Sequence, residues 1–255
     1  MFLYETLRPI RELEGAEFLK AYLDILLEHF LLWTRGGVHH RDLTLDNLMY
    51  RTEKNEVIGV LIDFDLATRS ACQSIDAGCT LQYTAFEILD VKATGTPYTH
   101  LYRHDLESFY WILIWVCNCV ENGREIDLNG SIFRPWKTGD YDLCYEKKLR
   151  YERGAGKHAS LVLPTQNALW HIAVSWNKHI KRTLRPVTED EPAPWTIATD
   201  AAESFTDFCR LLESKEVMYG LRAYRQSGDE LLECIEGFLA VVQSYLGEEI
   251  GDMYT

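Results

Sequence analysis

Three oxygen-bearing side chains near the start of the chain could do chemistry together. Asp42, Asn47 and Asp63 follow one another at intervals of five and sixteen residues. This order and spacing match the parts needed for phosphoryl transfer from a metal–nucleotide complex. Asp42 would accept the proton of a hydroxyl group. Asn47 and Asp63 would bind Mg²⁺, a hard ion that takes oxygen ligands and keeps several waters.

A β-hairpin is predicted to bring these side chains together. The residues that follow Asn47 read as a strand, a polar turn and an apolar returning strand. Folding about residues 54–55 sets Asn47 opposite Ile62, so Asn47 and Asp63 emerge at the same end of the hairpin. Asp42 lies on the loop just before. The alternative is ordinary turn chemistry, in which Asp and Asn cap their own backbone, but type, order and spacing together favour the metal and base roles.

Four stretches of sequence surround and follow these residues. They read His-Arg-Asp-Leu-Thr at 40–44, Ile-Asp-Phe-Asp-Leu-Ala at 62–67, Cys-Thr-Leu-Gln-Tyr-Thr-Ala-Phe-Glu at 79–87, and Tyr-Arg-His-Asp-Leu-Glu-Ser-Phe-Tyr at 102–110. They resemble the catalytic loop, the metal loop, the end of the activation segment and the central C-lobe helix of the protein kinase superfamily. The residues in these stretches are closest to those of the fungal-type protein kinases. The stretch Trp-Lys-Thr-Gly-Asp at 136–140, followed by Lys147, also resembles that family.

This resemblance implies the ligands and catalytic groups of the site. Asp42 would be the catalytic base, and Asn47 and Asp63 would hold Mg²⁺ and, through it, ATP. Arg41 would pair with a phosphate on the activation segment. Thr80 would hydrogen-bond the catalytic aspartate, as in serine/threonine kinases.

The resemblance also implies supporting roles. His40 would pack under the catalytic loop, Glu87 would be a structural anchor, and Asp105 would bind the backbone of the catalytic loop. Hydroxyl groups within or beside the activation segment are possible phosphorylation sites: Thr68, Ser70, Ser74, Thr80 and Thr84.

Residues 1–37 contain no Gly-x-Gly-x-x-Gly loop that could cover nucleotide phosphates. One helix, about 16–33, dominates them, with apolar residues at helical spacing. We therefore expect an α+β, mainly α fold: a kinase-like C-terminal lobe whose small β-hairpin carries the catalytic and metal loops, with the N-terminal lobe absent. A single domain, 1–255, would comprise a hinge-side segment and helix (1–37), the catalytic, metal and activation segments (38–90) and a helical remainder (91–255).

The helical remainder has further recognisable segments. Helices are predicted at 108–120, 141–153, 166–182, 200–214 and 229–246. The polar stretch 121–135 and the acidic, proline-rich stretch 186–194 are predicted as loops.

The composition of the chain restricts the classes of binding partner and the cellular compartment that we expect. The net charge of −13 argues against nucleic acid or an anionic membrane as partner, and a protein substrate or partner is expected instead. From the residues at the start of the sequence and the short apolar runs, we expect neither a secretory signal nor a membrane-spanning segment. Seven cysteines, mostly within apolar helical runs, indicate reduced thiols and a cytoplasmic or nuclear location.

Three functions remain open at this point. The first is ATP-dependent phosphoryl transfer to serine or threonine of a protein, favoured by Arg41, by the segment 80–87 and by Asp105. The second is a small-molecule phosphotransferase of the aminoglycoside or choline type. The third is a non-enzymatic, pseudokinase-like binding module that uses an exposed apolar face. Because half of the phosphate clamp is missing from the sequence, we expect the chain alone to bind ATP·Mg²⁺ weakly and to transfer phosphate negligibly.

Overall fold

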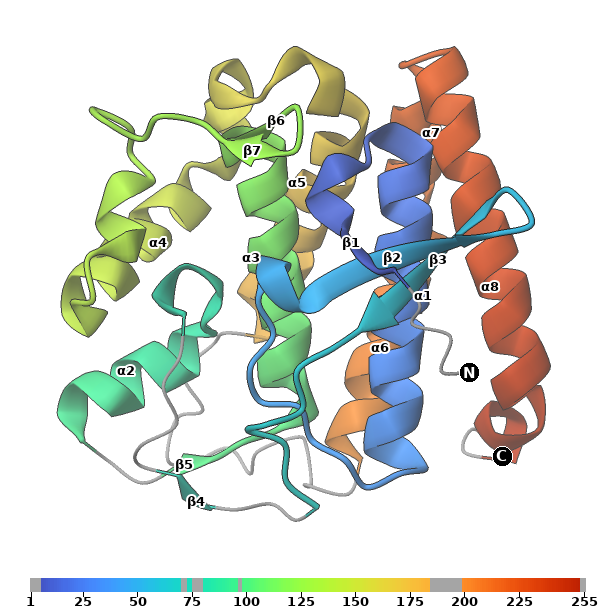
Figure 1. Ribbon diagram of the computed structural model, residues 1–255, viewed down its shortest axis with the longest axis horizontal. Coiled ribbons are helices and arrows are strands. Elements are labelled where there is room, and N and C mark those ends of the chain that lie inside the picture. Colours follow the sequence, from blue (N-terminus) through green and yellow to red (C-terminus); the bar gives the residue numbers. More distant parts are fainter. Residues whose placement is uncertain (1–5, 70–72, 75–79, 96–97, 184–198, 253–255) are drawn as a thin grey trace.

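The structure is a computed structural model that describes residues 6–69, 73–74, 80–95, 98–183 and 199–252 (Figure 1). Helices predominate and the strands form three small sheets, which confirms the predicted α+β, mainly α fold. The α-helices are α1 (Gly15–Thr34), α2 (Phe86–Thr94), α3 (Tyr102–Cys119), α4 (Tyr141–Arg153), α5 (Asn167–Thr183), α6 (Asp200–Leu212), α7 (Lys215–Arg222) and α8 (Gln226–Asp252). The strands are β1 (Arg8–Pro9), β2 (Leu48–Glu53), β3 (Glu56–Leu61), β4 (Gln73–Ser74), β5 (Tyr98–Thr99), β6 (Val120–Glu121) and β7 (Arg124–Glu125).

Strands β2 and β3 form the predicted hairpin. Leu48 pairs with Leu61 and Glu53 with Glu56, which leaves residues 54–55 as the turn. Both turn residues have positive φ, 51° and 67°, as a two-residue type I′ turn requires. Strand β1 pairs with the other edge of β2, so the strand order is β1-β2-β3.

Helix α1 covers the free edge of β3. The backbone N–H groups of Gly59 and Leu61 donate to the carboxylates of Asp24 and Glu28, each at 3.2 Å. Gly59 lets the two elements touch, because a methyl group there would lie 2.0 Å from the backbone oxygen of Ala21. The hairpin is therefore fixed against the helix that precedes it, and its register against α1 is set by two polar contacts.

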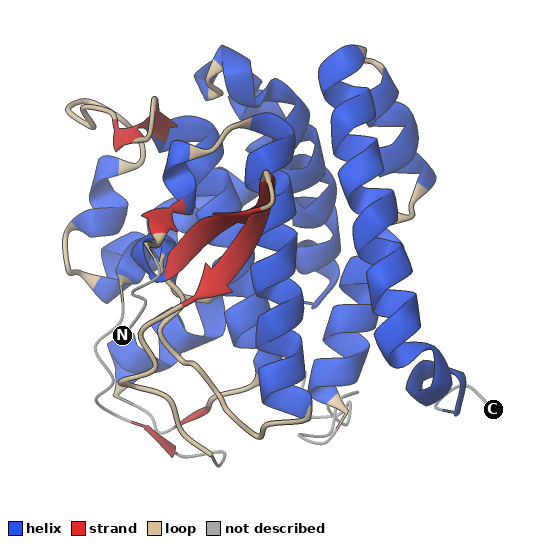
Figure 2. Ribbon diagram, turned by 45° about the vertical axis from the view of Figure 1, so that its right-hand side comes forward, coloured by secondary structure: helices blue, strands red, loops and turns tan. Residues whose placement is uncertain are grey.

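Helix α3 is the centre of the helical core. Every one of its residues except Arg103 is buried. Figure 1 shows α3 running through the middle of the molecule, with α1 and α8 side by side to its right and α4 to its left. Figure 2 shows the small three-stranded sheet lying across this helical body. A helix enclosed in this way must be apolar on all sides, as the run from Phe109 to Val116 is.

The predicted helices are confirmed with small shifts of their ends. The bounds of α4 are those predicted, and α3 begins six residues before the predicted start at 108. Two helices, α2 and α7, were not predicted, and the stretch 121–135, predicted as a loop, contributes to a short hairpin of β6 and β7. The proline-rich stretch 186–194 lies outside the described residues. None of the helices that the structure describes is long and apolar enough to cross a membrane.

Candidate active site

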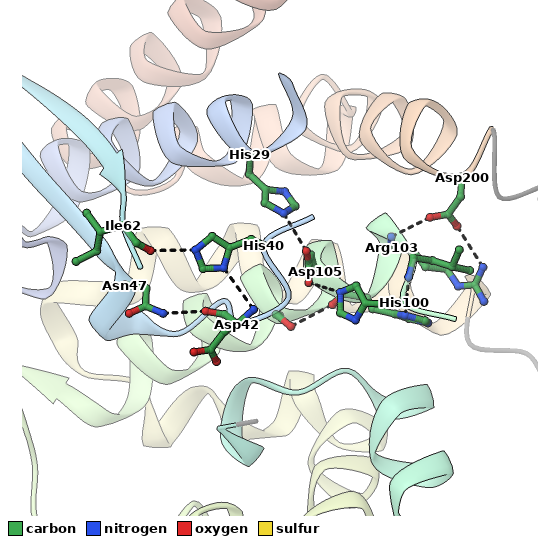
Figure 3. Close-up of polar contacts among 12 residues, drawn as sticks. His29, His40, Asp42, Asn47, Ile62, His100, Arg103, Asp105 and Asp200 are labelled. Atoms are coloured by element: carbon green, nitrogen blue, oxygen red, sulfur yellow. Dashed lines mark hydrogen bonds and ion pairs between the residues drawn. The ribbon is translucent and has the colours of Figure 1, made fainter. Parts of the chain in front are cut away.

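His40 joins the catalytic loop to the end of the hairpin. Its ring is buried, and Nε2 donates to the backbone oxygen of Ile62 at 2.9 Å while Nδ1 accepts from the backbone N–H of Asp42 at 3.3 Å (Figure 3). The edge of the ring also packs against Phe64, with 4.8 Å between ring centroids. Burial lowers the pKa of His40, partly offset by the bond to Ile62. The ring is therefore a neutral connector, with its proton on Nε2.

Asn47 lies at the start of the hairpin and holds the loop that carries Asp42. Its side-chain N–H donates to the backbone oxygen of Asp42 at 2.9 Å, and its own backbone oxygen accepts from Ile62 N–H at 3.1 Å. The second bond confirms that Asn47 stands opposite Ile62. Asp63, the next residue after Ile62, therefore emerges at the same end of the sheet as Asn47.

Asp42 has the electrostatic surroundings of a proton acceptor. Burial raises its pKa, the nearby carboxylate of Asp63 adds to the rise, and the side chain of Asn47 opposes it. Asp63 and Asn47 are thus close enough to Asp42 to affect its pKa, and a carboxylate with a raised pKa is a stronger base.

Asn47 and Asp63 suit a hard metal ion. Asp63 is exposed and adopts a φ of +64°, while Asn47 is 7 % exposed. In the described ranges, no three Asp, Glu, His or Cys side chains group closely enough to hold a metal. One carboxylate and one amide oxygen fit Mg²⁺, which takes its remaining ligands from water and phosphate, better than they fit a metal that needs a full set of protein ligands.

Asp105 is held by two imidazoles. His29 Nε2 donates to one carboxylate oxygen at 2.9 Å and His100 Nε2 to the other at 2.6 Å, and all three side chains are buried (Figure 3). Burial alone would raise the pKa of Asp105, but His100 and His29 outweigh it and hold the pKa well below its usual range. The bonds of Asp105 come from α1 and from the residues just before α3, and none from the catalytic-loop backbone is found among the described residues. Asp105 therefore links α1 to the residues just before α3.

Arg41 and Thr80 lie beside Asp42. Both border a cavity of about 30 Å³ that Asp42 also lines. Arg41 has a φ of +69°, and its Nε and Nη2 atoms are buried without a hydrogen-bond partner among the described residues. The backbone oxygen of Thr80 accepts from Tyr83 N–H and from Thr84 Oγ1, at 2.9 and 3.2 Å. No hydrogen bond joins Thr80 to Asp42 within the part of the chain that the structure describes.

Glu87 ties the end of the activation segment to the core. It accepts from Arg103 Nη2 at 2.8 Å and from His104 Nε2 at 2.9 Å, and Arg103 also contacts Asp200 of α6 at 3.2 Å. Burial opposes ionisation of Glu87, but the bonds and charges of His104 and Arg103 prevail and lower its pKa to about 2. This geometry suits the anchoring role that was expected.

The hydroxyl groups considered as phosphorylation sites differ in their surroundings. Thr84 is buried, and the backbone of Thr68 pairs with that of His39. Ser74 is in β4, and Ser70 lies outside the described residues.

Sequence reasoning missed three residues that shape the site. His29 and His100 hold Asp105, and Lys148 rather than Lys147 is the buried lysine of α4. A signal for Lys148 was available, because it lies four residues after the buried Cys144 and three before the buried Tyr151. Nothing local links His29 to a residue that is 76 positions away in the chain.

Comparison with known families gives one match. The model of a family described as fungal protein kinase matches residues 5–117. This range contains the catalytic loop, the hairpin, Asp63, the activation segment and most of α3. No curated protein matches the chain.

Proposed function

Because residues 5–117 of this chain match the model of the fungal protein kinase family, we propose that the site around Asp42 transfers the γ-phosphoryl group of ATP to a serine or threonine hydroxyl of a protein. One observation carries the proposal. The pairing of Asn47 with Ile62, together with the bonds of His40, gathers a base and two oxygen ligands at one end of the hairpin. These are the roles that phosphoryl transfer requires.

Each residue has a defined task in this reaction. Asp42 accepts the hydroxyl proton as the hydroxyl oxygen bonds to the γ-phosphorus and the bond from that phosphorus to the β–γ bridging oxygen breaks, which releases ADP. Asn47 and Asp63 hold Mg²⁺, which neutralises charge on the phosphates. Asn47 has a second task, since its bond to the Asp42 backbone fixes the base relative to the metal ligands.

The anchored end of the activation segment favours a protein as the acceptor. Glu87 fixes the start of α2 to α3 through Arg103 and His104, and the residues before it border the cavity at Asp42. A segment that is anchored in this way can bind an extended polypeptide beside Asp42, whereas a small-molecule phosphotransferase does not need such a segment.

Paramagnetic broadening by Mn²⁺·ATP tests the metal site even when binding is weak. We expect Mn²⁺·ATP, used in place of Mg²⁺·ATP, to broaden the side-chain amide resonance of Asn47 in the ¹⁵N-labelled chain. Asp63→Ala should abolish the broadening, because one of two protein ligands is lost. Asp65→Ala is the matched control: it removes an exposed carboxylate from the same loop and should leave the broadening intact.

Asp42→Asn separates the base from the metal site. This variant should retain the Mn²⁺·ATP broadening, because the metal ligands are unchanged. It should lose even the very slow transfer of radiolabelled phosphate to an acceptor protein that is expected of the wild-type chain, because its amide cannot take up the proton. A wild-type chain in which Asn47 does not respond to Mn²⁺·ATP would refute the enzymatic proposal and favour a binding module. Transfer to aminoglycosides or choline, but not to protein, would favour the small-molecule alternative.

A further inference from the structure

A lysine and a glutamate are buried together beside the residues that line the Asp42 cavity. Lys148 of α4 is fully buried, and its Nζ donates to the backbone oxygen of Thr84 at 2.8 Å. The ammonium group lies 4.4 Å from the ring centroid of Trp111 and 5.6 Å from that of Trp136. Glu107 of α3 contacts the indole N–H of Trp111 and is buried as well.

Glu107 holds the same stretch of backbone as Lys148. Its Oε1 accepts from the backbone N–H of Phe86 at 3.0 Å and from Trp111 Nε1 at 2.9 Å. The Thr84 carbonyl and the Phe86 N–H are thus held by two buried side chains, Lys148 and Glu107. Cys144, one turn before Lys148 on α4, adds a weaker contact from Sγ to Leu81 O at 3.5 Å.

The clamped backbone continues directly to the catalytic pocket. Thr84 Oγ1 donates to the backbone oxygen of Thr80 at 3.2 Å. Thr80, Tyr83 and Thr84 all line the cavity that Asp42 lines. A contact path therefore runs from Lys148 through Thr84 and Thr80 to the space in front of the base.

A charged side chain in this position needs a physical reason. Burying an ammonium group carries a large desolvation penalty, and the Thr84 carbonyl, two aromatic faces and a nearby carboxylate are among the groups that act against it. A methionine would fill the same space in α4 without that penalty. What methionine lacks is a donor for Thr84 O, and a charge-assisted bond holds a carbonyl in place more firmly than packing does.

We propose that Lys148, with Glu107, is a positioning residue that holds the segment Leu81–Phe86 at a fixed distance from Asp42. This role rests on the proposed phosphoryl transfer for its purpose, since the segment is where an acceptor polypeptide would bind. The bonds of Lys148 to Thr84 and of Glu107 to Phe86, called the clamp below, are present in the structure and can be tested without measuring activity.

Amide hydrogen exchange resolved by residue tests the clamp. In Lys148→Met, we expect exchange at residues 81–86 to accelerate by roughly tenfold or more, because the segment loses a bond to a charged donor. Exchange in α1 should change far less. Lys148→Arg should restore protection, since a guanidinium can still donate to Thr84 O. Lys147→Met is the matched control, because Lys147 is a partly exposed neighbour that pairs with Glu146 at the surface, and it should change nothing.

A double variant distinguishes the local loss of the bond to Thr84 from general unfolding. Glu107→Gln/Lys148→Met removes both buried ionisable side chains that hold this segment, yet it still lacks the donor to Thr84. It too should exchange rapidly at 81–86. Uniform acceleration throughout the core in both Met variants, or unchanged exchange at 81–86, would overturn the proposal.

Activity distinguishes this inference from the proposed function. In the clamp variants we expect the KM for the acceptor protein to rise by roughly tenfold or more while the KM for ATP stays unchanged, since only the acceptor side has moved. Asp42→Asn should abolish transfer and leave exchange at 81–86 as in the wild type. If the wild type transfers no phosphate, the proposed function fails, and the exchange results still decide the clamp.

Discussion

At the scale of single residues, the candidate site depends on polar contacts between segments that are distant in sequence. His40 contacts both the loop of Asp42 and the residue before Asp63, and Asn47 contacts the same two segments. The base and the metal ligands are therefore not independent side chains. A change in either connecting residue should alter the geometry of all three.

His40→Ala should destabilise the protein in a pH-dependent way. At pH 7.5 we expect the free energy of unfolding to fall by about 1–3 kcal/mol, because a buried ring with two hydrogen bonds is lost and Ile62 O and Asp42 N–H are left without partners. Burial lowers the pKa of His40 in the folded state, so the unfolded chain binds more protons there as the pH falls below about 6.5. The stabilisation by His40 is thus present above that pH and lost below it.

Urea unfolding of wild type and variant between pH 7.5 and pH 5 checks this sign. The difference between the two proteins should shrink toward acid pH. A difference that grows toward acid pH would mean that His40 is charged in the folded protein and pairs with an acid, contrary to the bonds described above.

At the scale of elements, the packing of the hairpin on α1 limits what β3 can contain. Gly59→Ala places a methyl group 2.0 Å from Ala21 O, a backbone atom that cannot move without displacing α1. We expect a loss of about 1–3 kcal/mol or more in the free energy of unfolding.

Gly237→Ala in α8 is the matched control for Gly59→Ala. A methyl group at Gly237 meets nothing within 4 Å, so alanine should stabilise the helix by about 0.5–1 kcal/mol. Thermal unfolding of both variants measures the contrast. Equal effects of the two substitutions would show that β3 does not pack against α1 as described.

The same elements show how far the sequence could predict this fold. The register of the hairpin about residues 54–55 was predictable because its turn chemistry is local, although its strands are bounded differently, and the charged helix at 141–153 was predicted with the bounds found. Helix α7 is short and contains Gly220, so its local signal is weak. The bonds of Asp105 to His29 and His100 join separate elements, and no spacing rule anticipates them. The contacts of His40 and Glu87 suit the supporting roles expected of them. The catalytic and metal-binding roles of Asp42, Asn47 and Asp63 stay predictions.

At the scale of the whole molecule, excess negative charge opposes the folded state. The chain carries 39 acidic and 26 basic side chains, with a net charge of −13. Folding brings these charges closer together, and the resulting repulsion is long-ranged and therefore easily screened by salt. Surface ion pairs such as Lys20–Asp24 and Lys137–Glu125 act in the opposite direction. Each is worth only about 0–1 kcal/mol, and salt weakens it as well.

We expect the repulsion to dominate, so added salt should stabilise the protein. Between low ionic strength and about 0.5 M NaCl at pH 7.5, the urea midpoint should rise, because the screening length shrinks to a few ångströms. The pI of about 5.1 provides an internal control. Near that pH the net charge vanishes, the repulsion disappears, and salt should leave the midpoint unchanged or lower it by weakening the ion pairs. A midpoint that falls with salt at pH 7.5 would instead mean that the local pairs outweigh the net charge.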